Sequence, residues 1–470
     1  MANPLSRRNF IKQTSCAAIG TTTLMSTLTN LKFLNAAAIA NSSTIIGGDY
    51  KALVCILQSG GNDSHNMLVP REEGRYNHYK NSRTEIALER SSILPLANSD
   101  FGLHPSMSGI QSLYQNGDLS FISNIGTLIR PLDKDQVLGN EQNLPLGLFS
   151  HADQVQQWQT SVPDERSSIG WGGRLADMMQ SMNTNPNISM NVSLSGTNIF
   201  QTGNQSVEYS IDAEDGAIGI INYDNPYDSR FIELRNQALD NIVDAHYDDV
   251  FKKTYIDVIR NSRDANAIVS EGLNEAPFLD DLFSSTDFSN SMKMVARMIS
   301  AREKLGAKRQ IFFVDMSGWD HHDELLASQA TMLKELSDGL KEFNDALVRL
   351  NADDCVTTFT CSEFGRTLTY NGEGTDHAWG GNVMVMGGPV KGGQIYGEYP
   401  LLELAGEFEL SNNAMYSNGI MLPTTSVDEY FAELALWFGV APSELSTVFP
   451  NIGNFYNAGG GGMPIGFIGV

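Results

Sequence analysis

Five short runs of apolar residues recur along the chain, and a polar or glycine-rich loop follows each of them. Runs that are apolar throughout are typical of strands buried on both faces of a parallel sheet. Helical patterns lie between them, most clearly at 325–350, where apolar residues recur near i, i+3, i+4 and i+7. This alternation predicts an α/β fold with a mostly parallel central sheet and helices on both faces. The runs are 52–57, 119–122, 311–314, 356–360 and 383–386.

Side chains that commonly bind metal ions stand next to four of these runs. Asp63 follows the first run, and Glu363 follows the fourth. Asp320 and His322 share the loop after the third run, and His377 lies in the loop before the fifth. Ligands of open α/β sheets bind just beyond the carboxyl ends of the strands. We therefore expect these five side chains to meet at one edge of the sheet.

Carboxylates combined with imidazoles suit a divalent metal, with zinc or manganese as the first choices and magnesium or calcium as alternatives. No cysteine belongs to the set, which excludes a structural zinc site built on thiolates. One or two ions are expected. Two ions about 4 Å apart would clamp the attacking and leaving oxygens of a phosphoryl or sulfuryl group. The alternative is that these residues only form turns and helix caps.

Three further residues are candidates for catalysis. Ser150 precedes a helical pattern, where it would either cap the helix or act as a nucleophile beside backbone N–H groups. His151 would bind a substrate oxygen or serve as a cap. Arg366 would hold a phosphate or sulfate through two hydrogen bonds, or pair with one of the many acidic side chains.

The first forty residues resemble a secretory signal. Ser6-Arg7-Arg8-Asn9-Phe10-Ile11-Lys12 precedes a weakly apolar stretch and then small residues at 36–40. The paired arginines resemble the twin-arginine export signal. Residues 1–40 are therefore expected to be a twin-arginine signal peptide, with the twin-arginine translocase as a partner during export. The mature chain is expected in the periplasm or outside the cell, and no later segment has 18 successive apolar residues.

The mature domain is expected to span 41–470. Within it, the segment at about 183–300 suggests extra β-structure followed by acidic helices, and we interpret it as an insertion that walls the site. The whole chain has a formal net charge of -24. Such an acidic protein repels nucleic acid and anionic lipid, so neither is an expected partner.

Several motifs together resemble the family called domain of unknown function 1501, whose members are exported proteins with a fold of the alkaline phosphatase and sulfatase superfamily. The motifs are spread over nearly the whole mature chain. They are Gly60-Gly61-Asn62-Asp63 with Asn66, Leu103-His104-Pro105, Ser150-His151 with Gln154 and Trp158, Gly318-Trp319-Asp320, His322-Asp323, Ser362-Glu363-Phe364-Gly365-Arg366-Thr367, Thr375-Asp376-His377, Trp437-Phe438-Gly439-Val440 and Phe449-Pro450.

The resemblance implies two metal ions around a nucleophile. By analogy with the superfamily, one ion would bind Asp63 and Glu363, the other would bind the remaining three predicted ligands, and Ser150 would be the nucleophile. The chain departs from the superfamily at Phe364, where a histidine is expected after the acidic residue, and no Cys-x-Pro-x-Arg sulfatase signature occurs.

These observations predict a metal-dependent hydrolase or transferase that acts on phosphate or sulfate esters of small molecules or saccharides. One alternative is an exported metal-binding or structural protein with a degenerate, non-catalytic site. A second alternative is a metal-free serine hydrolase, although the Gly-x-Ser-x-Gly motif of a nucleophile elbow is missing.

Overall fold

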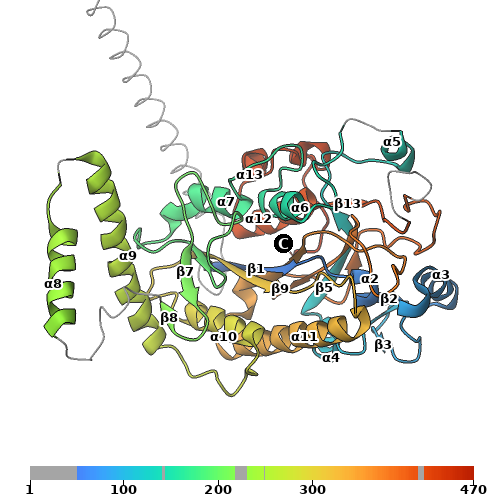
Figure 1. Cartoon of the computed structure of the whole chain (residues 1–470), viewed down its shortest axis with the longest axis horizontal. Coiled ribbons are helices and arrows are strands. Elements are labelled where there is room, and N and C mark those ends of the chain that lie inside the picture. Colours follow the sequence, from blue (N-terminus) through green and yellow to red (C-terminus); the bar gives the residue numbers. More distant parts are fainter. Residues whose placement is uncertain (1–49, 140–142, 218–229, 248, 411–417, 470) are drawn as a thin grey trace, which may run out of the picture. The chain divides into compact units, whose positions relative to one another are not determined.

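The computed structural model describes residues 50–139, 143–217, 230–247, 249–410 and 418–469 (Figure 1). The predicted signal peptide at 1–40 lies outside the described residues. The described helices are α2 (Ser64–Met67), α3 (Glu73–Arg83), α4 (Ser108–Asn116), α5 (Lys134–Leu138), α6 (His151–Thr160), α7 (Trp171–Met179), α8 (Arg230–Asp244), α9 (Val250–Asn274), α10 (Asp287–Ser300), α11 (Leu325–Arg349), α12 (Val427–Phe438) and α13 (Leu445–Val448).

A ten-stranded sheet forms the centre of the fold, in the order β12-β5-β11-β10-β1-β9-β6-β7-β8, with β13 paired to β5. Three further short strands form a separate sheet in the order β2-β4-β3. The central strands are β1 (Lys51–Ser59), β5 (Leu119–Gly126), β6 (Asn191–Ser193), β7 (Tyr209–Asp212), β8 (Gly216–Ala217), β9 (Arg309–Ser317), β10 (Val356–Ser362), β11 (Gly381–Met386), β12 (Ile395–Tyr396) and β13 (Thr425–Ser426); the others are β2 (Leu68–Pro70), β3 (Leu94–Pro95) and β4 (Phe101–Leu103).

All five predicted strands are confirmed, and each lies within one strand of the central sheet. β1 pairs in parallel with both β9 and β10, so the three strands end at the same edge. The strand at 383–386 differs from expectation because β11 runs antiparallel to β10 and β5. An antiparallel strand begins where its neighbour ends. The loop before β11 therefore reaches the edge at which β1, β9 and β10 finish.

Helices cover both faces of the sheet, as predicted (Figure 1). Successive side chains of β1 point to opposite faces. Ala52, Val54 and Ile56 join the core beneath α4, α10 and α11, whereas Leu53 and Cys55 join the core beneath α7 and α12. Each core is lined by apolar residues of the helices that cover it, so the sheet is buried on both sides. This is why its central strands are apolar throughout rather than alternating.

The segment predicted as an insertion, about 183–300, contributes to the main architecture. β6 pairs in parallel with β9, and α10 packs against α11. α8 and α9 pack against each other, and α9 contacts β8. Across the residues that the structure describes, every helix is too short or too polar to span a lipid bilayer.

Asp428 is a carboxylate in the first turn of α12 that is completely buried. Ser161 Oγ donates a hydrogen bond to its Oδ1, whereas Oδ2 has no partner in the described part of the chain. Burial raises the pKa of Asp428 to about 7, against the opposing effects of Ser161 and Arg174. The folded protein therefore binds this proton more tightly than the unfolded chain does.

A raised carboxyl pKa stabilises the fold at low pH, and that stabilisation is lost as the pH rises through the folded pKa. Between pH 5 and pH 8 this group should remove about 3 kcal/mol from the free energy of unfolding. Asp428→Asn mimics the protonated side chain, so urea unfolding should show a smaller loss over this range. The exposed control Asp215→Asn should keep the wild-type pH dependence. Equal losses in the wild type and Asp428→Asn would contradict the prediction.

Candidate metal centre

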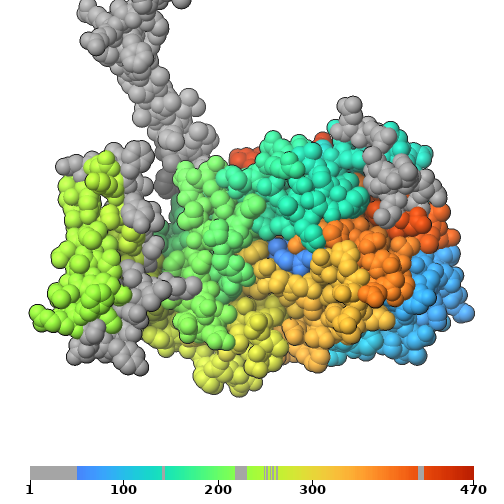
Figure 2. Space-filling model, in the orientation of Figure 1, coloured from blue at the N-terminus to red at the C-terminus, as the bar shows by residue number. Residues whose placement is uncertain are grey.

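Four segments meet where β1, β9 and β10 end. The loop after β9 carries Asp320 and His322, the residue after β10 is Glu363, and the loop before β11 carries His377. α6 begins at His151. In the space-filling view, blue atoms of the β1 segment reach the surface between the teal α6 segment and yellow-to-orange segments from the second half of the chain (Figure 2).

Gly60 allows the loops after β1 and β9 to pack closely. It has a φ of +109°, and a Cβ at this position would lie 2.4 Å from the backbone nitrogen of Asp320. Only glycine avoids both this clash and the strain of a positive φ. Gly60 thus lets the Asp320 loop pack against the end of β1.

Three predicted ligands converge on one point. His322 Nε2 lies 2.9 Å from His377 Nε2 and 3.1 Å from Asp320 Oδ1. His377 Nε2 lies 3.3 Å from the same Oδ1. Ligands that bind a tetrahedral ion at 2.0–2.1 Å are about 3.3 Å apart, as the edge of a tetrahedron requires. These three atoms therefore have the spacing that one divalent ion would need.

His151 approaches the other oxygen of the Asp320 carboxylate. Its Nε2 lies 3.5 Å from Asp320 Oδ2. One ring nitrogen of His151, one of His377 and one carboxylate oxygen of Asp320 all lie within 4.8 Å of one another. The sequence suggested that His151 binds substrate or caps a helix. Its contacts with the loop after β9 could not be predicted, because that loop is distant in the chain and approaches His151 only in the folded protein.

The second ring nitrogen of each histidine has its own oxygen partner. His151 Nδ1 lies 2.5 Å from Glu363 Oε2, and His377 Nδ1 lies 2.7 Å from the carbonyl oxygen of Phe149. His322 Nδ1 lies 3.5 Å from a carboxylate oxygen of Asp376. Histidines that bind metals usually hold their other ring nitrogen in this way, which sets the tautomer and the ring orientation. Glu363 thus contacts the cluster through His151.

Arg366 is fully buried at the base of the cluster. Its guanidinium donates hydrogen bonds to the carbonyl oxygens of Gly60, Gly61 and Thr375, and to Asp320 Oδ1. Of the two roles that the sequence left open, pairing with an acid is the one seen here. The guanidinium therefore positions Asp320 and joins the loops after β1 and β10.

Burial and charge around the cluster favour the protonation states of Asp320 and His377 that can bind a cation. Burial by itself would raise the pKa of Asp320, but the hydrogen bond and charge of Arg366, with His322 and His151, hold that pKa below its ordinary value. Burial lowers the pKa of His377, and the positive charge of Arg366 adds to the effect. An ionised carboxylate and neutral imidazoles are the forms that metals require.

Two predicted site residues have other contacts. Asp63 is buried and pairs with Arg83, and within the described ranges it makes no contact with the cluster. Ser150 is the N-cap of α6, where its Oγ accepts a 3.5 Å hydrogen bond from the backbone of Asp153. Phe364 stacks on His377 with ring centroids 4.3 Å apart, so it orients a candidate ligand without supplying one.

We expect Glu363→Gln to lower metal affinity by about 10- to 100-fold, as is usual for loss of a carboxylate behind a metal-bound histidine. Glutamine can still accept the 2.8 Å hydrogen bond from the backbone of Gly60, but its amide then presents donors to His151 Nδ1. Competition with a chelating dye measures the affinity. Glu433→Gln is a matched control, because Glu433 is buried and accepts backbone hydrogen bonds away from any histidine. Equal affinities for all three proteins would contradict the orienting role.

Comparison with solved structures found, among others, Ps i-CgsB in complex with k-i-k-neocarrahexaose, at 10% identity and a TM-score of 0.31, covering 86% of this chain and 76% of that chain. The C-terminal periplasmic domain of EcEptC from Escherichia coli, in complex with Zn, matches at 8% identity and a TM-score of 0.29, covering 73% and 74%. A mutant of the alkaline phosphatase PafA matches at 11% identity and a TM-score of 0.27, covering 69% and 64%.

Comparison with curated proteins found no match. Comparison with protein families found one that matches residues 50–448, which is most of the described part of the chain. That span includes every candidate ligand discussed above. The chain belongs to the family described as Protein of unknown function (DUF1501), as its motifs indicated.

Proposed function

We propose that this protein is an exported, metal-dependent hydrolase or transferase that acts on phosphate or sulfate esters. The observation that carries the proposal is the convergence of Asp320, His322 and His377 at mutual distances of 2.9–3.3 Å. The Asp320 and His322 side chains are each 43% exposed, so a substrate could reach the cluster from solvent. Zinc or manganese suits this set of nitrogen and oxygen ligands best.

One ion fits the cluster better than two. Asp320, His322 and His377 would hold it, and His151 lies beside them at the other oxygen of Asp320. An ion held there would supply Lewis acidity toward an ester oxygen. A second ion would need Asp63, whose charge is matched by Arg83, and the position of Phe364 offers no ligand atom. Binding of a second ion by Asp63 and Glu363 remains a prediction.

Other groups of this chain could bind and orient the substrate. The positive end of the α6 dipole lies beside the cluster because α6 begins at His151. Glu363 holds His151 Nδ1, which prepares the imidazole to move a proton at Nε2 if that nitrogen is not bound to metal. Ser150 would attack the ester only if its Oγ left the N-cap, so its nucleophilic role remains a prediction.

The proposed setting is the periplasm or the outside of the cell, reached through the twin-arginine translocase. The proposed substrates are small-molecule or saccharide esters, and the acidic net charge of -24 argues against polyanionic partners such as nucleic acid. The proposed location and the proposed substrate class both rest on the sequence.

A non-catalytic metal site is the second candidate, and one observation favours it. A ring nitrogen of His151 lies within 4.8 Å of ligand atoms of Asp320 and His377. If His151 joined the three converging ligands, four protein ligands would close a tetrahedral site as in structural zinc centres. In that case no position would remain for a substrate oxygen.

The test combines metal analysis with an ester assay. Protein purified without added metal is analysed for elements, and then assayed with aryl phosphate and aryl sulfate. We expect His322→Ala to lose both the metal and the turnover. His78→Ala is a matched control, because His78 also contacts a carboxylate and its side chain is 40% exposed.

Each outcome selects one candidate. Bound metal with turnover that depends on His322 supports the proposed hydrolase or transferase. Bound metal without turnover on either ester supports the non-catalytic site. Turnover that persists in a chelator and in His322→Ala, but disappears in Ser150→Ala, would favour the metal-free serine hydrolase.

A further inference from the structure

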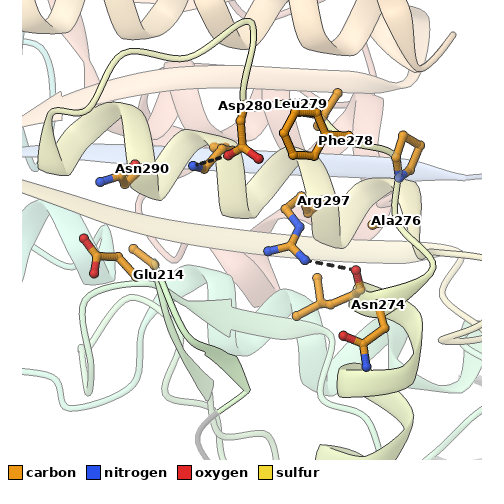
Figure 3. Close-up of a pocket in the computed structure, with 12 residues that line it drawn as sticks. Glu214, Asn274, Ala276, Phe278, Leu279, Asp280, Asn290 and Arg297 are labelled. Carbon is orange, nitrogen blue, oxygen red and sulfur yellow. Dashed lines mark hydrogen bonds and ion pairs between the residues drawn. The ribbon is translucent and has the colours of Figure 1, made fainter.

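A cavity separate from the candidate metal centre lies between the β7–β8 turn, the carboxyl end of α9 and one face of α10 (Figure 3). Its volume is about 480 Å³, within the range of small-molecule sites. It shares no residue with the candidate metal centre. Its walls come from segments far apart in the sequence, Ala213 with Glu214, 273–280 and α10.

α10 presents a row of polar side chains to this cavity. Asn290, Lys293 and Arg297 are spaced i, i+3 and i+7, which places them along one face of the helix, while the opposite face is buried in the core. Lys293 pairs with Asp280 at 2.7 Å, so its charge is matched. Arg297 donates one hydrogen bond to the carbonyl oxygen of Leu273 and has no carboxylate partner among the described residues.

An acceptor and two amides complete the polar lining. Glu214 and Asn274 border the space into which Arg297 points (Figure 3). Glu214 forms no ion pair with Arg297, and the side chains of Glu214, Asn274 and Asn290 make no hydrogen bond within the described ranges. The cavity therefore offers a cation and a separate anion, with amide groups near them, to whatever occupies it.

Phe278 gives the cavity an apolar wall. Its ring lines the cavity and is 76% exposed, so it is available to contact a ligand. A flat apolar ring beside amides and carboxylates suits the face of a sugar ring, whose C–H groups pack on aromatics while its hydroxyls form hydrogen bonds. An anionic group on that sugar would pair with Arg297, and hydroxyl groups would donate to Glu214.

We propose that this cavity binds an anionic saccharide, with its carboxylate or sulfate group on Arg297, its hydroxyls on Glu214 and the asparagine amides, and its ring against Phe278. The site is distinct from the candidate metal centre, and the proposal does not depend on catalysis there.

Calorimetric titration of the full-length protein with D-glucuronate and with D-glucose 6-sulfate tests the proposal, with D-glucose and inorganic sulfate as comparisons. At least one charged sugar should bind about tenfold or more tightly than either comparison, because it alone offers both the anion and the hydroxyls. Which charged sugar binds more tightly identifies the anionic group. The titration is repeated on Asp320→Ala, where unchanged binding separates this cavity from the metal centre.

Two pairs of variants locate the binding. Arg297→Gln should weaken binding of the charged sugar by about 10- to 100-fold. Arg302→Gln should not, since Arg302 also donates to a backbone carbonyl but lies outside the cavity. Phe278→Ala should weaken binding by about tenfold, and Phe231→Ala, which removes another ring that is 76% exposed, should leave it unchanged.

Three results would overturn the proposal: no binding of either charged sugar, binding no tighter than that of D-glucose or sulfate, or binding that survives both Arg297→Gln and Phe278→Ala. If Arg297→Gln does not fold, Phe278→Ala decides alone, because its exposed ring contributes little to the core.

Discussion

Replacing Asp320 with alanine should lower metal affinity by about 10³-fold or more. Its carboxylate supplies the negative charge among the converging ligands and lies within 3.5 Å of three imidazoles. Two unit charges 4 Å apart attract by about 4 kcal/mol at an effective dielectric constant of 20, which corresponds to roughly 10³-fold. Removal of the carboxylate would also leave the charge of Arg366 facing the cation. Equilibrium dialysis followed by elemental analysis measures the change.

Asp323→Ala is the control for that variant. Asp323 is an exposed acid in the same loop as Asp320, so its removal changes the net charge of the loop equally. We expect it to keep the metal stoichiometry of the wild type. If Asp320→Ala also kept wild-type stoichiometry and affinity, the cluster would not be a metal centre and the proposed function would fail with it.

Replacing Arg366 with methionine should destabilise the fold by about 3–5 kcal/mol, because each buried carbonyl that loses its hydrogen-bond donor costs about 1–3 kcal/mol. Three backbone carbonyls would lose their donors, and Asp320 would lose its cation. Arg366→Lys should recover only part of the loss, because an ammonium cannot reproduce the spread of donors of a guanidinium. Urea unfolding in the presence of chelator measures stability without a contribution from bound metal.

Arg349→Met provides the comparison. Arg349 also pairs with an aspartate, Asp281, but both side chains are largely exposed. Exposed ion pairs contribute about 0–1 kcal/mol, so this variant should unfold near the wild-type midpoint. Similar losses for Arg366→Met and Arg349→Met would show that the buried guanidinium does not join the loops as the structure indicates.

Much of the fold could be predicted because the strands are buried on both faces. Such strands must be apolar throughout, and this pattern is visible in β1, β9 and β10 without knowledge of their neighbours. The alternation with helices such as α11 then indicates a mostly parallel sheet. The antiparallel direction of β11 was not visible, since an apolar run of six residues reads the same in either direction.

The candidate site could be predicted only in part. Asp320, His322 and His377 were found because each lies in a loop next to a buried strand. His151, Glu363 and Asp376 carry roles that depend on partners distant in the chain. His151 and Glu363, for example, are separated by 212 positions. A motif indicates that such residues matter but does not tell which of them converge at one point and which only hold the converging side chains.

Sequence alone indicated the five apolar strands of the central sheet, the loops that carry candidate metal ligands and the family that the chain resembles, because periodicity and residue type are local properties. Tertiary structure decided that Arg366 faces Asp320, that Asp63 faces Arg83 and that Ser150 caps α6. A charged side chain pairs with an oppositely charged group that lies within a few ångströms of it. Which groups come this close depends on how the strands and loops pack in space, and not on their order along the chain.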